Sequence, residues 1–164
     1  MVAESRVPCS FPLWTLSFAF LLAASCSGVS SLTAESLNAA KQRWETSGPS
    51  YYRMVVETKG DRNEPSKYEV TVRDKEVIKF LRNGQLMTAT SGQDYSVEGL
   101  FHVLALELDL MKKPEVLGAP PGYSSYPMAS FDAKTGRLLR FQRSVGGTKN
   151  SIEIDVREFE ILGK

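Results

Sequence analysis

The spacing of apolar residues constrains the fold of this chain most, because it changes twice from a helical to a strand period. Apolar side chains recur every three or four residues in 33–47 and 96–113, and at every second position in segments of 51–90 and 128–161. This order predicts an α+β domain. We expect a twisted antiparallel sheet of about seven strands, in the order helix, four strands, helix, three strands, with both helices on the concave face.

The first predicted helix begins at a cap that Thr33 or Ser31 supplies. It places Leu37, Ala40 and Trp44 on one face. The Ser-Gly-Pro sequence at 47–49 ends the helix, with a left-handed glycine cap and a proline that cannot continue the helix. We therefore expect one amphipathic helix of about three turns.

Two turn signals organise the four strands that follow. Asp74-Lys75 and Asn83-Gly84 are both typical of tight turns between antiparallel strands. The first of these strands is expected to start at Tyr51, and the second to include 68–72. The third and fourth are expected at 76–82 and 85–90. Later strands are expected at 128–132, 137–144 and 151–161.

The second predicted helix is the most apolar segment after the N-terminal region. Ser96 can cap it, Glu98 suits the positive end of its dipole, and Lys112-Lys113-Pro114 ends it. We expect Phe101 of this helix to meet Trp44 of the first helix in the core. The long connection 114–126 is a possible recognition loop, because its prolines stiffen it and Tyr123 and Tyr126 offer amphipathic contact area.

The last hairpin has a register that makes both of its faces chemically consistent. If Val145 faces Asn150, apolar residues oppose apolar ones and basic residues oppose acidic ones. The expected pairs are Phe141 with Ile154, Leu139 with Val156, Arg140 with Asp155, and Gln142 with Glu153. On this basis the arginine series Arg137, Arg140, Arg143 and the acidic series Glu153, Asp155, Glu158, Glu160 are interpreted as solvated pairs rather than as an anion site or a paired-carboxylate centre.

The N-terminal residues predict export. Residues 1–25 have the short polar start, the apolar run and the small residues of a signal peptide, and the run is shorter than a membrane-spanning helix needs. Leu22-Ala-Ala-Ser-Cys26 resembles the lipobox of bacterial lipoproteins, which implies a lipid on Cys26. We expect a tether at 26–32 and a single domain at 33–164. The alternative is a signal peptide cut for soluble secretion.

Few residues offer reactive chemistry. Cys26 and Cys9 are the two cysteines, so the domain after the tether has no internal disulfide, thiol nucleophile or cysteine-ligated metal. His102 is the one histidine and lies inside the apolar helix, where a structural role is favoured. No phosphate loop, metalloprotease motif or nucleophile elbow is present. The formal net charge of +1 does not favour nucleic acid. No catalytic residue, cofactor or metal is expected.

The order of several short segments is similar to a bacterial family catalogued as domain of unknown function 6174. The segments that carry this resemblance are Ala39–Trp44, Tyr51-Tyr52, Tyr68–Val72, Val97–Phe101 and Phe131–Gly136. The resemblance covers roughly residues 35–161. It implies secretion, frequent lipidation and this α+β layout, and it implies no known activity.

These observations lead to three functional hypotheses from different classes. The first is a non-enzymatic interaction or binding module of the bacterial cell envelope, held on the membrane surface by its lipid, with an unknown protein or ligand partner. The second is a carrier of a lipid or another hydrophobic ligand within the envelope. The third is a hydrolase that uses His102 or the acidic strand. An apolar cavity between sheet and helices favours the carrier, whereas a cleft converging on His102 and an acid favours the enzyme.

Overall fold

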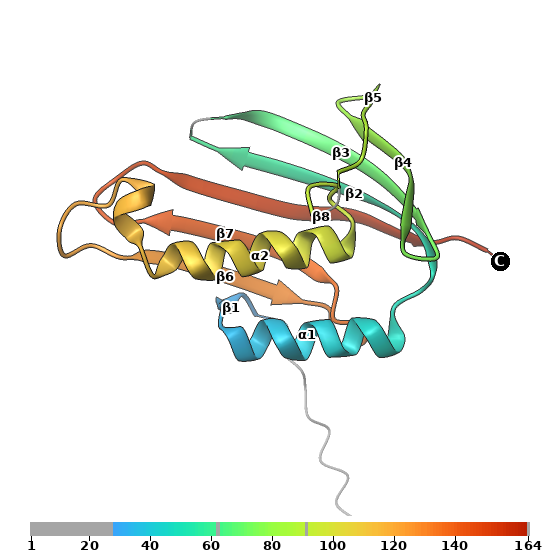
Figure 1. Cartoon of the computed structure of the whole chain (residues 1–164), viewed down its shortest axis with the longest axis horizontal. Coiled ribbons are helices and arrows are strands. Elements are labelled where there is room, and N and C mark those ends of the chain that lie inside the picture. Colours follow the sequence, from blue (N-terminus) through green and yellow to red (C-terminus); the bar gives the residue numbers. More distant parts are fainter. Residues whose placement is uncertain (1–27, 62, 91, 164) are drawn as a thin grey trace, which may run out of the picture.

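A computed structural model describes residues 28–61, 63–90 and 92–163 of the chain (Figure 1). The helices are α1 (Ala34–Ser47), α2 (Val97–Met111) and a short 3₁₀ helix η1 (Pro114–Leu117). The strands are β1 (Ser30–Ser31), β2 (Tyr51–Gly60), β3 (Asn63–Arg73), β4 (Glu76–Arg82), β5 (Gln85–Leu86), β6 (Ser125–Phe131), β7 (Leu138–Val145) and β8 (Ser151–Ile161).

The eight strands form one open antiparallel sheet in the order β1-β6-β7-β8-β2-β3-β4-β5. Both long helices lie on the same side of this sheet, and the other side is open to solvent (Figure 1). The predicted fold class is therefore confirmed. The C-terminal strand β8 lies in the middle of the sheet, between β7 and β2, and so joins the two hairpin groups that α2 separates in the sequence.

The core fills the space between the helices and the sheet. Trp44 of α1 and Phe101 of α2 both belong to this core, and the Trp44 ring packs edge to face with the rings of Tyr52 and Phe159. The largest of the side chains that are almost completely buried are Tyr52, Phe141, Met54, Leu100, Leu104, Leu138 and Ile154. Each comes from a position that the apolar periods placed inside, except Leu138. A bulge between Ser130 and Phe131 shifts the pairing of β6 with β7.

The predicted tether is partly wrong, because its last residues belong to the domain. Ser30 and Ser31 form β1 and pair with Ala129 and Met128 of β6. Leu32 is only 2% exposed, and its N–H donates to the Pro127 carbonyl over 2.9 Å. Burial of this leucine and pairing along the edge of β6 fix the segment, so the folded body begins about three residues earlier than expected.

Helix α1 ends at the predicted place but not with the predicted backbone. Thr33 caps its first turn in a capping box with Ser36. At the other end, Gly48 has a φ of −69°, so it is not left-handed. A Cβ on Gly48 would lie 2.6 Å from the Trp44 carbonyl oxygen and 2.7 Å from its indole Cδ2. Glycine is needed here because the chain passes directly against Trp44.

Several strand boundaries also differ from the prediction. The Asn83-Gly84 turn is present with positive φ at both residues, but β5 ends at Leu86 rather than at 90. Strand β6 begins at Ser125, three residues earlier than expected, and η1 occupies part of the connection that was expected to be irregular. Tyr126 therefore lies in a strand rather than in a loop.

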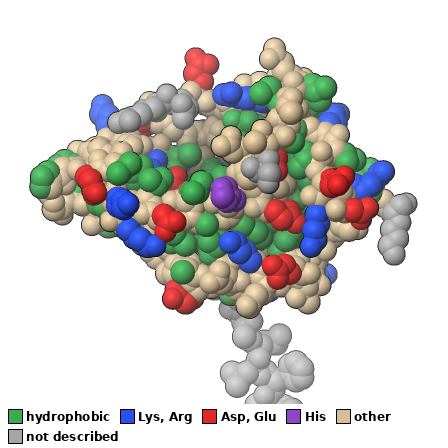
Figure 2. All heavy atoms as spheres, viewed as in Figure 1, with side chains coloured by type: hydrophobic (Ala, Val, Ile, Leu, Met, Phe, Trp, Pro, Cys, Tyr) green, Lys and Arg blue, Asp and Glu red, His purple; other side chains and the backbone are tan. Residues whose placement is uncertain are grey.

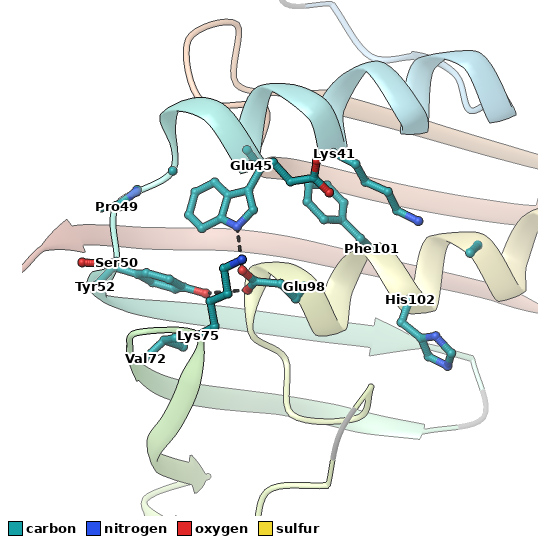
Figure 3. A pocket seen from close by; sticks show the side chains of 13 residues that line it. Lys41, Glu45, Pro49, Ser50, Tyr52, Val72, Lys75, Glu98, Phe101 and His102 are labelled. Atoms are coloured by element: carbon teal, nitrogen blue, oxygen red, sulfur yellow. Dashed lines mark hydrogen bonds between the residues drawn. The ribbon is translucent and has the colours of Figure 1, made fainter.

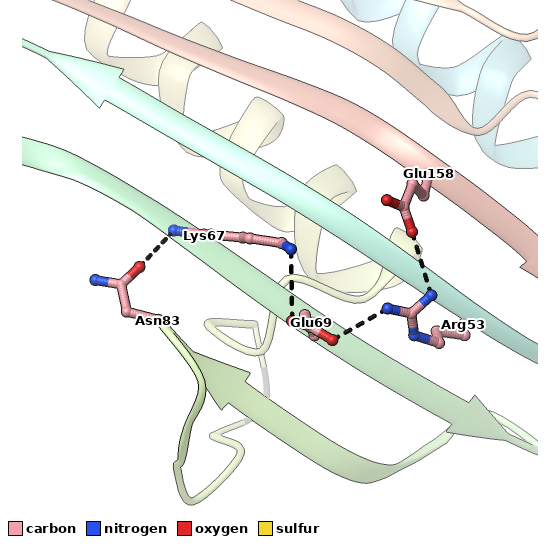
Figure 4. A network of polar contacts seen from close by, with 5 residues as sticks. All are labelled: Arg53, Lys67, Glu69, Asn83 and Glu158. Atoms are coloured by element: carbon pink, nitrogen blue, oxygen red, sulfur yellow. Dashed lines mark hydrogen bonds and ion pairs between the residues drawn. The ribbon is translucent and has the colours of Figure 1, made fainter.

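The register of the β7–β8 hairpin is confirmed. Arg140 pairs with Asp155, Phe141 with Ile154 and Gln142 with Glu153. The fourth predicted pair, Leu139 with Val156, does not form, because the pairing of these two strands ends at Arg140. On the open face, Arg140 forms ion pairs with Glu153 and with Asp155, so the predicted pairing of opposite charges is present, but Asp155 is only 8% exposed and the pair is not fully solvated. A similar ion-pair group on that face links Arg53 to Glu69 and Glu158 (Figure 4).

The solvated-pair interpretation is wrong for the other two arginines. Arg143 is only 6% exposed and points to the helix side, where its Nε lies 3.5 Å from Glu107 Oε2 of α2. Arg137 is half-buried, with its guanidinium 4.7 Å from the centre of the Phe159 ring. An odd spacing between Arg140 and Arg143 places their side chains on opposite faces of the strand, which is the physical reason for the difference.

Two expectations concern residues that the structure does not describe. The signal peptide at 1–25 and the lipidation site Cys26 lie outside the described residues. In the part of the chain that is described, neither helix is long and apolar enough to cross a membrane.

Candidate functional site

A pocket of about 370 Å³ opens between the end of α1, the beginning of α2, the start of β2 and the end of β3 (Figure 3). Its walls are mainly apolar, and charged side chains lie among them. We call it the α1–α2 pocket. It is lined by Lys41, Trp44, Glu45, Gly48, Pro49, Ser50, Tyr52, Val72, Lys75, Glu98, Phe101, His102 and Ala105.

The carboxylate of Glu98, an exposed residue of the pocket lining, is held by two aromatic side chains. Trp44 Nε1 donates to Glu98 Oε1 over 2.8 Å, and the Tyr52 hydroxyl donates to Oε2 over 3.2 Å (Figure 3). The two rings meet edge to face with centroids 5.4 Å apart. Burial and the negative charge of Glu98 raise the pKa of Tyr52, so this hydroxyl remains a donor at physiological pH.

The first turn of α2 fixes the position of Glu98. Ser96 caps the helix by accepting from Gly99 N over 3.0 Å, and Asp94 Oδ1 accepts from Ser96 N over 2.9 Å. A Cβ on Gly99 would lie 2.4 Å from that Asp94 oxygen, so glycine permits the close approach. Val97 N also donates to the Tyr52 hydroxyl over 3.1 Å, which ties the helix start to β2. The carboxylate is therefore preorganised by both the helix and the sheet.

The mouth of the pocket carries side chains of both charges. Lys41 and Glu45 come from α1, and Lys75 comes from the β3–β4 turn, where Asp74 and Lys75 have φ values of 51° and 68°. This left-handed turn brings Lys75 to the pocket (Figure 3). Among residues 28–61, 63–90 and 92–163, no ion pair involves Lys41, Glu45, Lys75 or Glu98.

His102 is an exposed residue of the pocket lining and packs against the loop at Gly92. A Cβ on Gly92 would lie 2.8 Å from its Cδ2. Figure 2 shows the histidine exposed on the helix side, with apolar side chains around it and charged ones farther out. Within the described ranges no hydrogen bond or ion pair joins His102 to an acid, and no group of His, Cys, Asp and Glu suits a metal ion.

The structure does not bring the two tyrosines of the predicted recognition loop to this pocket. Tyr123 is 53% exposed and lies against Gly146 and Gly147 of the β7–β8 turn. Tyr126 is 57% exposed on the open face of the sheet, because it alternates with the buried Ser125 and Pro127. Both remain accessible, but they belong to different elements.

A second polar cluster lies beneath the other end of α2. The Glu107 and Arg143 side chains are buried, and Glu107 Oε2 and Arg143 Nε make no hydrogen bond. Arg143 Nη2 donates to Asn150 Oδ1 over 3.2 Å, and Asn150 Nδ2 donates to the Leu117 carbonyl over 2.8 Å. This chain of contacts connects α2, the β7–β8 hairpin and η1.

Sequence reasoning missed both polar groups for the same reason. Glu98 was assigned only to the helix dipole, and its partners Trp44 and Tyr52 are 54 and 46 residues away in the chain. Glu107 was not singled out at all. The one available signal was an acidic residue inside an apolar helix stripe, which calls for a buried partner.

Comparisons with known proteins add no assignment. The sequence matches no family model, and it matches no curated protein.

Proposed function

We propose that this chain is a non-enzymatic binding module of the bacterial cell envelope, exported and held at the membrane by a lipid on Cys26. Its ligand-binding surface is the α1–α2 pocket. The observation that carries this proposal is the preorganised carboxylate of Glu98 among the aromatic side chains of an open pocket.

The size and lining of the pocket support ligand binding. A volume of about 370 Å³ lies within the usual range for small-molecule sites, which combine apolar walls with a few well-placed polar groups. Aromatic rings of Trp44, Tyr52 and Phe101 supply the walls, and Glu98 supplies an oriented acceptor. A site of this kind needs little rearrangement to bind.

A carrier of hydrophobic ligands is the second candidate, and the apolar side chains of the same pocket favour it. Val72, Phe101 and Ala105 offer contact to an acyl chain or a ring. Against the carrier, a cluster of buried side chains lies between the helices and the sheet, and the α1–α2 pocket lies at one end of this cluster. We therefore place the binding module first.

The engagement of Glu98 supports a non-enzymatic role. Both of its oxygens accept hydrogen bonds from aromatic donors, and neither accepts one from His102 in the described structure. A general acid–base pair needs its two groups within hydrogen-bond reach of one another or of a shared substrate proton. The geometry instead suits recognition.

The lipid anchor rests on the N-terminal sequence. Cys26 precedes the first residue of β1 by four positions, so at full extension the tether spans about 14 Å. A lipidated chain thus holds its body within that distance of the membrane. If Cys26→Ser leaves the protein in the membrane fraction after carbonate washing, the anchor is wrong.

The binding role is tested by ligand capture from a detergent-solubilised envelope of the source cells. Wild-type protein is compared with Ala105→Phe, which fills the pocket, and with Leu106→Phe, a control on the exposed side of the same helix. Mass spectrometry then identifies extracted lipids and small molecules. We expect wild type and Leu106→Phe to retain a compound that Ala105→Phe loses. Identical extracts from all three proteins would contradict the proposal.

A further inference from the structure

We propose that the α1–α2 pocket recognises an organic ammonium, meaning a small ligand with a positively charged nitrogen on an apolar or aromatic body. This inference rests on the proposed binding role of the same pocket and adds the chemical class of the ligand. It follows from the geometry around Glu98.

The Glu98 carboxylate is oriented but not neutralised. Its two hydrogen bonds come from an indole N–H and a phenol O–H, which are neutral donors. No ion pair in the described ranges involves it. Each carboxylate oxygen can accept more than one hydrogen bond, so acceptor capacity remains for a ligand. A cationic donor would form the stronger, charge-assisted type of hydrogen bond there.

The surrounding aromatic side chains suit the same ligand. Trp44, Tyr52 and Phe101 all line the pocket and place apolar groups beside the carboxylate, although each of these side chains is at most 6% exposed. An apolar body attached to the nitrogen would gain contact with Val72 and Ala105. The pocket thus offers an acceptor for the charge and a surface for the body of one molecule.

The two lysines at the mouth do not reverse this preference. Lys41 and Lys75 carry their charges on long flexible stems, which can turn away to solvent. Glu98, in contrast, is fixed by two elements, and Glu45 adds a second negative charge to the lining. An anionic ligand would meet these carboxylates. Lys75 extends over the pocket in Figure 3, so it competes with a ligand ammonium and its removal should strengthen binding.

The experiment uses Trp44 fluorescence and three probes of matched shape. The protein is produced with Trp14→Phe, so that Trp44 is its one tryptophan whether or not residues 1–25 are removed. The probes are 2-phenylethylamine, 2-phenylethanol and 3-phenylpropanoate, which at neutral pH are cationic, neutral and anionic. We expect the amine to bind about tenfold more tightly than either of the others. Fragments of this size are expected to bind at roughly millimolar concentrations.

Three substitutions separate a specific site from general electrostatic attraction. Glu98→Gln keeps one oxygen that can accept from Trp44, replaces the oxygen that accepts from Tyr52 by an amide nitrogen, and removes the charge. It should weaken amine binding about tenfold. Glu45→Gln is the matched control. It removes an equal charge from the same pocket without touching the hydrogen bonds of Glu98, and it should change affinity less than about threefold. Lys75→Met should strengthen amine binding. Circular dichroism of each variant verifies that the fold is retained.

Three results would overturn the ligand class. They are tighter binding of the carboxylate probe, an equal loss of affinity in Glu98→Gln and Glu45→Gln, and no response of Trp44 to any probe. The proposed binding role is judged separately by the capture comparison with Ala105→Phe, which makes no assumption about ligand charge. Capture of a neutral or anionic compound would therefore support the binding role but refute the proposal that the ligand is an organic ammonium.

Discussion

The buried pair Glu107–Arg143 allows a quantitative prediction. At 3.5 Å, two opposite charges attract each other by about 5 kcal/mol at an effective dielectric constant of about 20. Moving each charge out of water costs several kcal/mol, so attraction and desolvation nearly cancel for the intact pair. Removing only one partner leaves the other charge buried without compensation. We expect Arg143→Met and Glu107→Leu each to lower the free energy of unfolding by about 3–5 kcal/mol, and the double variant to lie within about 1 kcal/mol of wild type.

The two single variants should differ in their response to pH. Burial raises the pKa of Glu107 above its ordinary value of 4.5, and Arg143 offsets part of this rise. Without Arg143 the pKa rises further. The folded state of Arg143→Met then binds a proton more readily than the unfolded state, so its stability increases as the pH falls from the raised pKa towards 4.5. The loss of unfolding free energy in Arg143→Met, relative to wild type, should therefore become smaller as the pH falls from the raised pKa of Glu107 to about 4.5. Arg143 cannot lose its charge, so the deficit of Glu107→Leu should not shrink.

Urea unfolding followed by circular dichroism at several pH values measures both effects, provided that the slope with denaturant stays constant among variants. The reasoning is refuted if Arg143→Met costs less than about 1 kcal/mol at neutral pH, or if the losses of the two single variants add up in the double variant. The first result would mean that the charges remain solvated, and the second that they do not interact.

Two more predictions follow from neighbouring parts of the structure. Arg140→Ala should cost less than about 1 kcal/mol by urea unfolding, because the Arg140 side chain is partly exposed and Asp155 keeps Arg157 Nη2 as a partner at 3.2 Å. A loss as large as that of Arg143→Met would contradict the assignment of faces. Gly48→Ala should cost about 1–3 kcal/mol and shift the fluorescence of Trp44, since the added Cβ would lie 2.7 Å from indole Cδ2. Gly28→Ala is its control, with nothing within 4 Å, and similar effects of both changes would remove the steric explanation.

The residues of the α1–α2 pocket show which features can be predicted from the sequence and which cannot. The period of the apolar residues placed Trp44, Tyr52 and Phe101 on inward faces, and the capping signal placed Ser96 at the start of α2. Both signals are local, because they depend on neighbours within one or two turns of the chain. They gave no means of predicting that one carboxylate would bind two of these aromatic rings.

The arginines of β7 also show the difference between what the sequence predicts and what only the tertiary structure decides. The hairpin register was determined by the sequence alone, because the opposing strands are joined by a short turn and a slip of one residue would turn every apolar side chain outwards. Arg143 was interpreted as solvated together with Arg140, although alternation with Phe141 places it on the inward face. Its partner Glu107 could come only from the tertiary structure, since α2 lies across this strand after a separation of more than thirty residues.

The sequence by itself therefore determined the two helices, the hairpin register and most of the buried positions, because these follow from repeating local patterns. The packing of α1 and α2 against the sheet decided the pocket, the partners of Glu98 and the burial of the Glu107–Arg143 pair. Such contacts depend on the relative placement of elements, which is set by the summed packing of the whole core and has no local signature in the chain.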